Sequence, residues 1–222
     1  MIYFDNVTKV YDDGTVALKN IDLKIKANEF ITIVGHSGAG KTTLIKMLLA
    51  EEELTDGTIY FESNDISKLN KREIRKLRRR IGTIFQDFRL LPNKTVYENI
   101  SFAMEAAGYP DDEIESDVPH VLELVGLYKK AFSFPEELSG GEKQRVAIAR
   151  AIVTQPDVIV ADEPTGNLDP ENTYEIVEIL KKINDLGTTV ILTTHNSGIV
   201  KELGRRVIVM EEGEIIQDSI NQ

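Results

Sequence analysis

The order of apolar and polar residues divides the chain into strand and helix patterns. Short alternating or apolar segments at residues 2–4, 8–11, 16–18 and 21–25 are separated by polar turns such as Asp12-Asp13-Gly14. They predict a layer of short antiparallel strands. Further strand patterns follow at residues 30–34, 58–61, 81–85, 158–161, 188–194, 207–210 and 215–217.

Apolar residues at helical spacing occupy most of the remaining chain. They predict helices over residues 42–50, 96–107, 114–125, 143–154 and 172–184. A length of 222 residues with 41% hydrophobic residues suits one large α/β domain, residues 1–222. The segment from about residue 87 to 138 carries helical patterns without a strand, and we interpret it as a helical insert.

Residues 68–80 carry eight Lys or Arg and one acidic residue, Glu73. Because Ile74, Leu77 and Ile81 fall at helical spacing, the segment predicts an amphipathic helix with a solvated basic face. A surface for nucleic acid or lipid is the less favoured alternative. The net charge of −11 disfavours a nucleic-acid backbone as the main partner, so we expect none.

Composition also bears on the compartment. The sequence has no cysteine, which excludes structural disulfides and thiolate metal sites. No run approaches the roughly 18 apolar residues of a membrane span, and the chain opens with a strand pattern instead of a charged leader. We therefore expect a soluble, cytoplasmic protein.

A glycine-rich loop follows the strand pattern at residues 30–34. Gly35, Gly40, Lys41 and Thr42 fit the pattern G-x-x-x-x-G-K-[ST], in which backbone N–H groups surround phosphate oxygens. Lys41 is expected to reach the terminal phosphates and the Thr42 hydroxyl to bind Mg²⁺. The helix that follows turns the positive end of its dipole toward the anion. Because a strand pattern precedes the loop and a helix pattern follows it, a phosphate site is favoured over an ordinary turn.

A second glycine-rich helix start lies at residues 138–142. Ser139, Gly140 and Gly141 offer a hydroxyl and free N–H groups to an anion. An N-cap with a flexible lead-in explains the same residues, and the sequence leaves both interpretations open.

Polar residues follow three of the buried strand patterns. Asp162 and Glu163 come after residues 158–161, Gln86 after residues 81–85 and His195 after residues 188–194. An acid at the carboxyl end of a parallel strand is suited to hold Mg²⁺ beside a phosphate loop, which favours Asp162. Glu163 can activate a water only if a turn redirects its side chain. The alternatives are solvated loop residues, and His36 and His120 are interpreted as ordinary polar residues.

Two aromatic or apolar features remain ambiguous. Tyr11 precedes a turn where its ring could stack on a purine, although a half-buried strand tyrosine is the simpler interpretation. Phe88, Leu90 and Leu91 are either core residues or an exposed docking surface.

Taken in order, the phosphate loop, Gln86, residues 138–142 and 158–163, Asn167-Leu168-Asp169 and His195 resemble the ATP-binding cassette (ABC) ATPases along the whole chain. The resemblance implies an α/β P-loop NTPase fold of the ABC type. That fold has a mixed central sheet, an antiparallel β subdomain and a helical subdomain.

The resemblance also implies roles for individual residues. Tyr11 would stack on the adenine of ATP, Glu163 would be the general base and His195 would contact the γ-phosphate. Gln86 would lie near the attacking water. The Mg²⁺ ligands would be Thr42, Gln86 and Asp162. The phosphates would contact Gly35, Ser37, Gly38, Ala39, Gly40, Lys41, Thr42 and Thr43.

The implied partners are a second copy and a membrane protein. Ser139, Gly140 and Gly141 would contact the ATP of another copy, giving an ATP-dependent head-to-tail homodimer. Residues 164–169 resemble the branch that serves lipoprotein release and macrolide export. Residues 81–107, and especially 85–99, are similar to the bacterial cell-division ATPases. That narrower likeness implies an integral membrane protein of the FtsX type, docked beside residues 88–91 on the inner face of the membrane, and control of cell-wall hydrolysis.

Other functional classes fit the motifs less well. An ATPase subunit of a lipoprotein-release or macrolide-type exporter is the main alternative, since it differs only in its membrane partner. A small-molecule kinase leaves residues 138–142 without a role, and DNA-repair relatives insert long coiled coils or zinc modules that this chain lacks. One departure from the family pattern is Asn196, where Asp is frequent.

Overall fold

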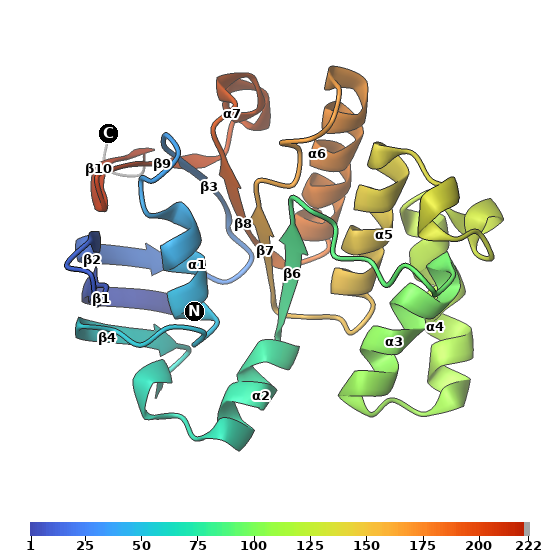
Figure 1. The fold of residues 1–222 in the computed structure, drawn as a ribbon, viewed down its shortest axis with the longest axis horizontal. Coiled ribbons are helices and arrows are strands. Elements are labelled where there is room, and N and C mark those ends of the chain that lie inside the picture. The colour runs from blue at the N-terminus through green and yellow to red at the C-terminus, as the bar shows by residue number, and fades with distance from the viewer. Residues whose placement is uncertain (220–222) are drawn as a thin grey trace.

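The computed structural model describes residues 1–219 and is built around a six-stranded sheet with the order β10-β9-β3-β8-β7-β6 (Figure 1). The strands from β9 to β6 run parallel, whereas β10 pairs antiparallel to β9. The carboxyl ends of β3, β7, β8 and β6 therefore meet at one edge, where the predicted polar residues lie. Their bounds are β3 (Phe30–Val34), β6 (Ile81–Phe85), β7 (Val158–Asp162), β8 (Thr189–Thr194), β9 (Arg206–Glu211) and β10 (Glu214–Asp218).

A second sheet, of antiparallel strands in the order β2-β1-β4-β5, packs beside the first. Its strands are β1 (Ile2–Val10), β2 (Val16–Ile25), β4 (Asp56–Phe61) and β5 (Asn64–Asp65). The prediction of four separate strands before residue 26 is wrong, because β1 and β2 are each continuous. Register shifts interrupt their pairing, and Asn6 and Asn20 absorb them with φ of 50° and 48°. Asparagine tolerates this left-handed conformation better than most residues.

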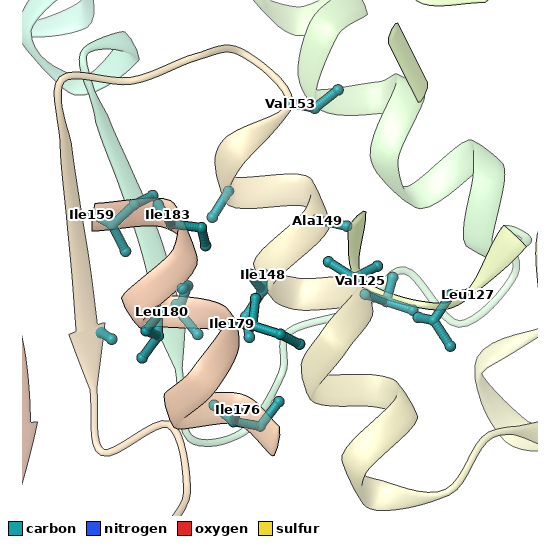
Figure 2. Packing of buried hydrophobic residues seen from close by; sticks show 14 of the residues in the cluster. Val125, Leu127, Ile148, Ala149, Val153, Ile159, Ile176, Ile179, Leu180 and Ile183 are labelled. Carbon is teal, nitrogen blue, oxygen red and sulfur yellow. The ribbon is translucent and has the colours of Figure 1, made fainter. Parts of the chain in front are cut away.

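Two hydrophobic clusters lie on the two faces of the central sheet. Helix α1 (Lys41–Leu48) belongs to the cluster between the two sheets, with Ile31, Ile33 and the inner faces of β1 and β4. Helices α5 (Gly140–Ile152) and α6 (Pro170–Asp185) cover the opposite face, and Figure 2 shows Ile148, Ile176 and Leu180 packed there with Ile159 of β7. The phosphate loop and the second glycine-rich helix start are thus on helices of opposite faces.

The helical insert packs against α5 and away from the second sheet. It contains α3 (Val96–Ala107), α4 (Asp111–Leu124) and the short turns η2 (Tyr128–Lys130) and η3 (Pro135–Glu137). The predicted helix at residues 96–107 is confirmed. It starts at a capping box between Thr95 and Glu98 and ends at Gly108 in the left-handed conformation.

The basic segment forms α2 (Lys71–Arg79), which starts at a capping box on Asn70 and buries Leu77. The prediction that Ile81 belongs to this helix is wrong, because Ile81 is the first residue of β6. Part of the basic face is structural: Arg80 pairs with Glu62 and Asp157 at 2.8 and 2.6 Å.

Several other bounds differ from the predictions. Helices α5 and α6 begin earlier than the apolar spacing indicated, because Ser139 and Asp169 cap them. Helix α7 (Ser197–Leu203) and β5 were not predicted. Within residues 1–219, no helix combines the length and apolar character needed to cross a bilayer.

Candidate functional site

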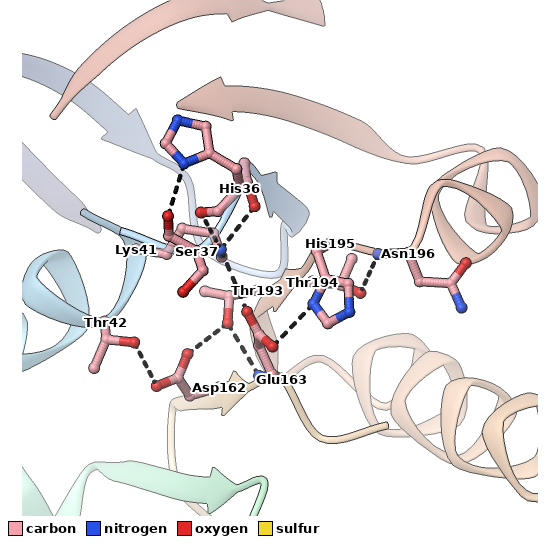
Figure 3. A network of polar contacts seen from close by, with 11 residues as sticks. His36, Ser37, Lys41, Thr42, Asp162, Glu163, Thr193, Thr194, His195 and Asn196 are labelled. Carbon is pink, nitrogen blue, oxygen red and sulfur yellow. Dashed lines mark hydrogen bonds and ion pairs between the residues drawn. The ribbon is translucent and has the colours of Figure 1, made fainter. Parts of the chain in front are cut away.

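The glycine-rich loop joins β3 to α1 at the carboxyl edge of the sheet. Gly40 precedes the helix with φ of 101°, and no side chain caps the amides of the first turn. Such amides are donors that an anion can occupy. Lys41 is 5% exposed and its Nζ donates to the carbonyl oxygens of Gly35 at 2.8 Å and His36 at 3.2 Å. The lysine is therefore folded back over the loop (Figure 3).

Asp162 lies at the end of β7, directly beside the loop. The Thr42 hydroxyl donates to Asp162 Oδ2 at 3.0 Å, and the buried Thr193 hydroxyl of β8 donates to Oδ1 at 2.6 Å (Figure 3). A hydroxyl and a carboxylate are oxygen ligands of the kind that Mg²⁺ prefers, with phosphate oxygens and waters completing its shell. The residues present thus fit Mg²⁺. In the described part of the chain, no group of three His, Cys, Asp or Glu side chains forms a cation site.

Glu163 turns toward the same loop although it follows Asp162 directly. Its φ is 49°, so the chain leaves the strand in a left-handed conformation. Glu163 Oε1 lies 3.3 Å from Lys41 Nζ, and Oε2 lies 3.0 Å from Nδ1 of His195 (Figure 3). Three predicted residues, one from a helix start and two from strand ends, therefore meet at one carboxylate.

An open cavity of about 330 Å³ lies beside this carboxylate. Glu163, Gly166 and His195 line it together with Tyr174 of α6. The His195 side chain is 61% exposed, so its ring faces solvent as well as Glu163. The His195 ring can therefore contact a ligand that enters the cavity from solvent.

Gln86 and Tyr11 lie at the periphery. The Gln86 amide donates to Asn167 Oδ1 at 3.2 Å, and Asn167 donates back to the Gln86 carbonyl at 3.3 Å. These bonds tie Gln86 to the turn after Glu163 and not to Thr42 or Asp162. The Tyr11 hydroxyl is 3.4 Å from Thr43 Oγ1, which places the half-buried ring next to the first turn of α1.

Ser139 is exposed and caps α5. Its hydroxyl accepts from Glu142 N at 3.2 Å, and Glu142 accepts from Ser139 N at 2.8 Å. The backbone N–H of Ser139, which donates to the Glu142 carboxylate, is the main cause that lowers the pKa of Glu142 below its usual value. Gly141 is buried against α6, since a Cβ there would lie 1.7 Å from Asn172 Oδ1. Gly140 is exposed beside them.

Thr193 of β8 was not among the predicted site residues. It is a polar residue in an apolar strand, two positions before His195, and that placement was the available signal.

The other two histidines lie on the surface. His36 is exposed with its ring 2.7 Å from Ser37 O, and His120 is exposed with its ring 2.6 Å from Ser116 O. Both fit their interpretation as ordinary polar residues.

Comparisons with known proteins agree on one family. A family model described as ABC transporter matches residues 18–166. Cell division ATP-binding protein FtsE of Streptococcus pneumoniae serotype 2 (strain D39) is 50% identical over 98% of this chain and 95% of its own length. The protein of the same name from Bacillus subtilis (strain 168) is 49% identical over 98% and 96%.

A solved structure matches the fold. It is a dimeric post-hydrolysis state of the ATP-binding cassette MJ0796 bound to ADP and Pi, with a TM-score of 0.88 and 36% identity over 98% of this chain and 97% of that chain. The expected α/β cassette, with its mixed sheet and antiparallel and helical subdomains, is confirmed. Because the family model spans more than half of the chain and these relatives match it almost end to end, the chain belongs to the ABC transporter family of ATP-binding cassette ATPases.

Proposed function

We propose that this ATPase hydrolyses Mg²⁺-ATP to drive or gate an integral membrane protein of the FtsX type in bacterial cell division, and so regulates cell-wall hydrolysis. The observation that carries the cell-division role is an identity of 49–50% over nearly the full length of relatives named Cell division ATP-binding protein FtsE. In this proposal residues 1–222 act as one nucleotide-binding domain. It sits at the inner face of the cell membrane through its partner.

The phosphates of ATP bind at the loop between β3 and α1. Residues 35–43 supply backbone amides, and Lys41 exchanges its present carbonyl and Glu163 contacts for phosphate oxygens. Tyr11 lies against Thr43 of the same helix turn, where its ring is available to a base. Thr42 and Asp162 would hold Mg²⁺, which would supply positive charge beside the phosphates.

Glu163 acts as the general base. Its carboxylate is paired with Lys41 and His195, so a phosphate that takes both partners leaves the carboxylate free to orient a water and accept its proton. His195 then contacts the γ-phosphate. Gln86, held by the turn at Asn167, borders the attacking water and the Mg²⁺ site.

A second copy completes the site. Ser139 is exposed at the start of α5, on the sheet face opposite α1, so it is suited to meet a nucleotide bound outside its own chain. Ser139, Gly140 and Gly141 of one copy would then contact the ATP on the phosphate loop of the other. The dimeric form of the related cassette with ADP and Pi supports this arrangement.

The membrane partner docks beside residues 88–91. Phe88, Leu90 and Leu91 are each partly exposed, and Leu90 also packs on the cluster beneath the helical insert. The segment thus combines a fixed position with accessible apolar surface.

Co-expression with candidate partners tests this function. We expect the chain to co-purify in detergent with an FtsX-type protein and its ATP turnover to depend on that partner, while Glu163→Gln co-purifies without turnover. Co-purification with a lipoprotein-release or macrolide-export membrane protein in place of the FtsX-type protein would overturn the cell-division role.

A further inference from the structure

The Thr193 side chain hydrogen-bonds to both Asp162 and Glu163, and no other side chain that the structure describes within residues 1–219 contacts both in this way. Thr193 is fully buried in β8, in register with Asp162 of β7. Its hydroxyl donates to Asp162 Oδ1 at 2.6 Å and accepts from the backbone N–H of Glu163 at 3.0 Å (Figure 3). The Thr193 hydroxyl therefore donates its proton to Asp162 and accepts a hydrogen bond from Glu163, the next residue along the chain.

One bond orients the Asp162 carboxylate, and the other restrains the backbone of Glu163. Asp162 has two carboxylate oxygens, and the bond to Oδ1 leaves Oδ2 facing the Thr42 hydroxyl at 3.0 Å. Glu163 is a non-glycine residue at φ 49°, a strained conformation that persists only where the surrounding structure imposes it. The Glu163 N–H is held by the Thr193 hydroxyl and also by the Thr193 carbonyl at 3.2 Å.

We propose that Thr193 is a positioning residue whose hydroxyl aims the Asp162 carboxylate at the Mg²⁺ site and fixes the turn that carries Glu163. The inference rests on the roles proposed above for Asp162 and Glu163. Residues that hydrogen-bond to a metal ligand typically change metal affinity or activity about 10- to 100-fold when they are removed.

The chain offers a matched control for the loss of a buried hydroxyl. Thr32, in the adjacent strand β3, is also fully buried, and its Oγ1 has no hydrogen-bond partner. Thr32→Val and Thr193→Val remove the same atom from neighbouring strands and keep the β-branched shape. Thr193→Ser keeps the hydroxyl and removes only the methyl group.

The experiment compares these three variants with the wild-type chain. Binding of ADP in EDTA reports the phosphate loop without the metal, and binding of Mn²⁺ to the ADP-loaded protein, followed by electron paramagnetic resonance, reports the metal site without turnover. We expect Thr193→Val to bind ADP in EDTA like the wild type but to bind Mn²⁺ about 10-fold or more weakly. Its kcat should fall about 10- to 100-fold, and Thr193→Ser should restore both properties.

Defined results would overturn the inference. Unchanged Mn²⁺ affinity and kcat in Thr193→Val, or a defect equal to that of Thr32→Val, would show that the hydroxyl positions nothing. Loss of ADP binding in EDTA, or a Ser variant as weak as the Val variant, would assign Thr193 to the fold alone.

Asp162→Asn separates this inference from the proposed site. If Asp162→Asn weakens Mn²⁺ binding and Thr193→Val does not, only the positioning role fails. If neither variant changes Mn²⁺ binding, the metal assignment fails with it.

Discussion

A methyl group added at Gly141 tests how closely the second glycine-rich helix start is fitted to α6. A Cβ at this position would lie 1.7 Å from Oδ1, 2.4 Å from Cγ and 3.1 Å from Cβ of Asn172. The Asn172 amide cannot move away freely, because its Nδ2 donates to Asp169 Oδ2 at 2.6 Å. Gly141→Ala must therefore displace either that side chain or the two helices.

The adjacent residue provides the reference. A Cβ at Gly140 would meet only Leu168 Cδ2 at 3.5 Å, which is an ordinary contact. Alanine is better than glycine in a helix by up to about 1 kcal/mol, so Gly140→Ala should be neutral or stabilising. Overpacking costs about 1–3 kcal/mol. We expect Gly141→Ala to be less stable than Gly140→Ala by about 1–3 kcal/mol, or about 2–4 °C in Tm for each kcal/mol in a chain of this size.

A double-mutant cycle identifies the cause. Asn172→Ala removes the atoms at 1.7 and 2.4 Å and leaves the contact at 3.1 Å, so it should restore most of the stability lost in Gly141→Ala. Thermal unfolding of the four chains should give a coupling of at least about 1 kcal/mol. Additive effects within about 0.5 kcal/mol would contradict this steric explanation, because they would mean that the methyl group and Asn172 do not compete for space.

Three other changes probe the proposed chemistry. Glu163→Gln should retain ATP binding, since Lys41 loses a competing carboxylate, while the single-turnover hydrolysis rate falls about 10²- to 10⁴-fold; unchanged hydrolysis would remove Glu163 as the base. Ser139→Asp keeps a good N-cap, so Tm should hold while the added charge abolishes steady-state turnover; a drop in Tm without loss of turnover would leave Ser139 a cap alone. Because the folded-state pKa of Glu142 is lowered, its stabilising effect is present above the ordinary value of 4.5 and is lost as pH falls through the folded pKa. Glu142→Gln should therefore flatten the acid limb of a Tm-against-pH curve; an acid limb equal to that of the wild type would contradict the capping geometry.

The sequence predicted the parts of the fold where local signals agree. Residues 158–161 are an uninterrupted apolar run, and residues 30–34 and 81–85 are apolar apart from Thr32, Gly82 and Thr83; each segment forms a buried strand of the central sheet. The helix at 96–107 has a capping box at one end and a glycine at the other, so both bounds were predictable. By contrast, β1 was divided into two because Asp5 and Asn6 resemble a turn, and only the pairing with β2 and β4 shows that the strand continues.

The candidate site was predicted less completely, because its geometry depends on contacts between distant strands. That Asp162 and Glu163 both face the loop required a left-handed residue after β7, which no motif specifies. The attachment of Gln86 to Asn167 joins residues that are 81 positions apart in the sequence. Thr193 was not predicted, because threonine is common in strands and Thr193 is followed directly by Thr194 in β8, so a packing role is the ordinary expectation.

The segment beside β6 shows a similar dependence on a distant residue. Phe88 and Arg89 have φ of 58° and 47°, two consecutive left-handed conformations without a glycine. Arg150, near the end of α5, donates to the carbonyls of Arg89 at 2.6 Å and Phe88 at 2.9 Å, so it can hold both residues in place. Helix α5 starts at the Ser139 cap and carries Arg150 near its end. The same helix therefore holds residues 88 and 89 through Arg150 and presents Ser139, the residue proposed to meet a second copy's ATP. A displacement of residues 88–91 by a docked partner would then act on α5 directly, without passing through the central sheet.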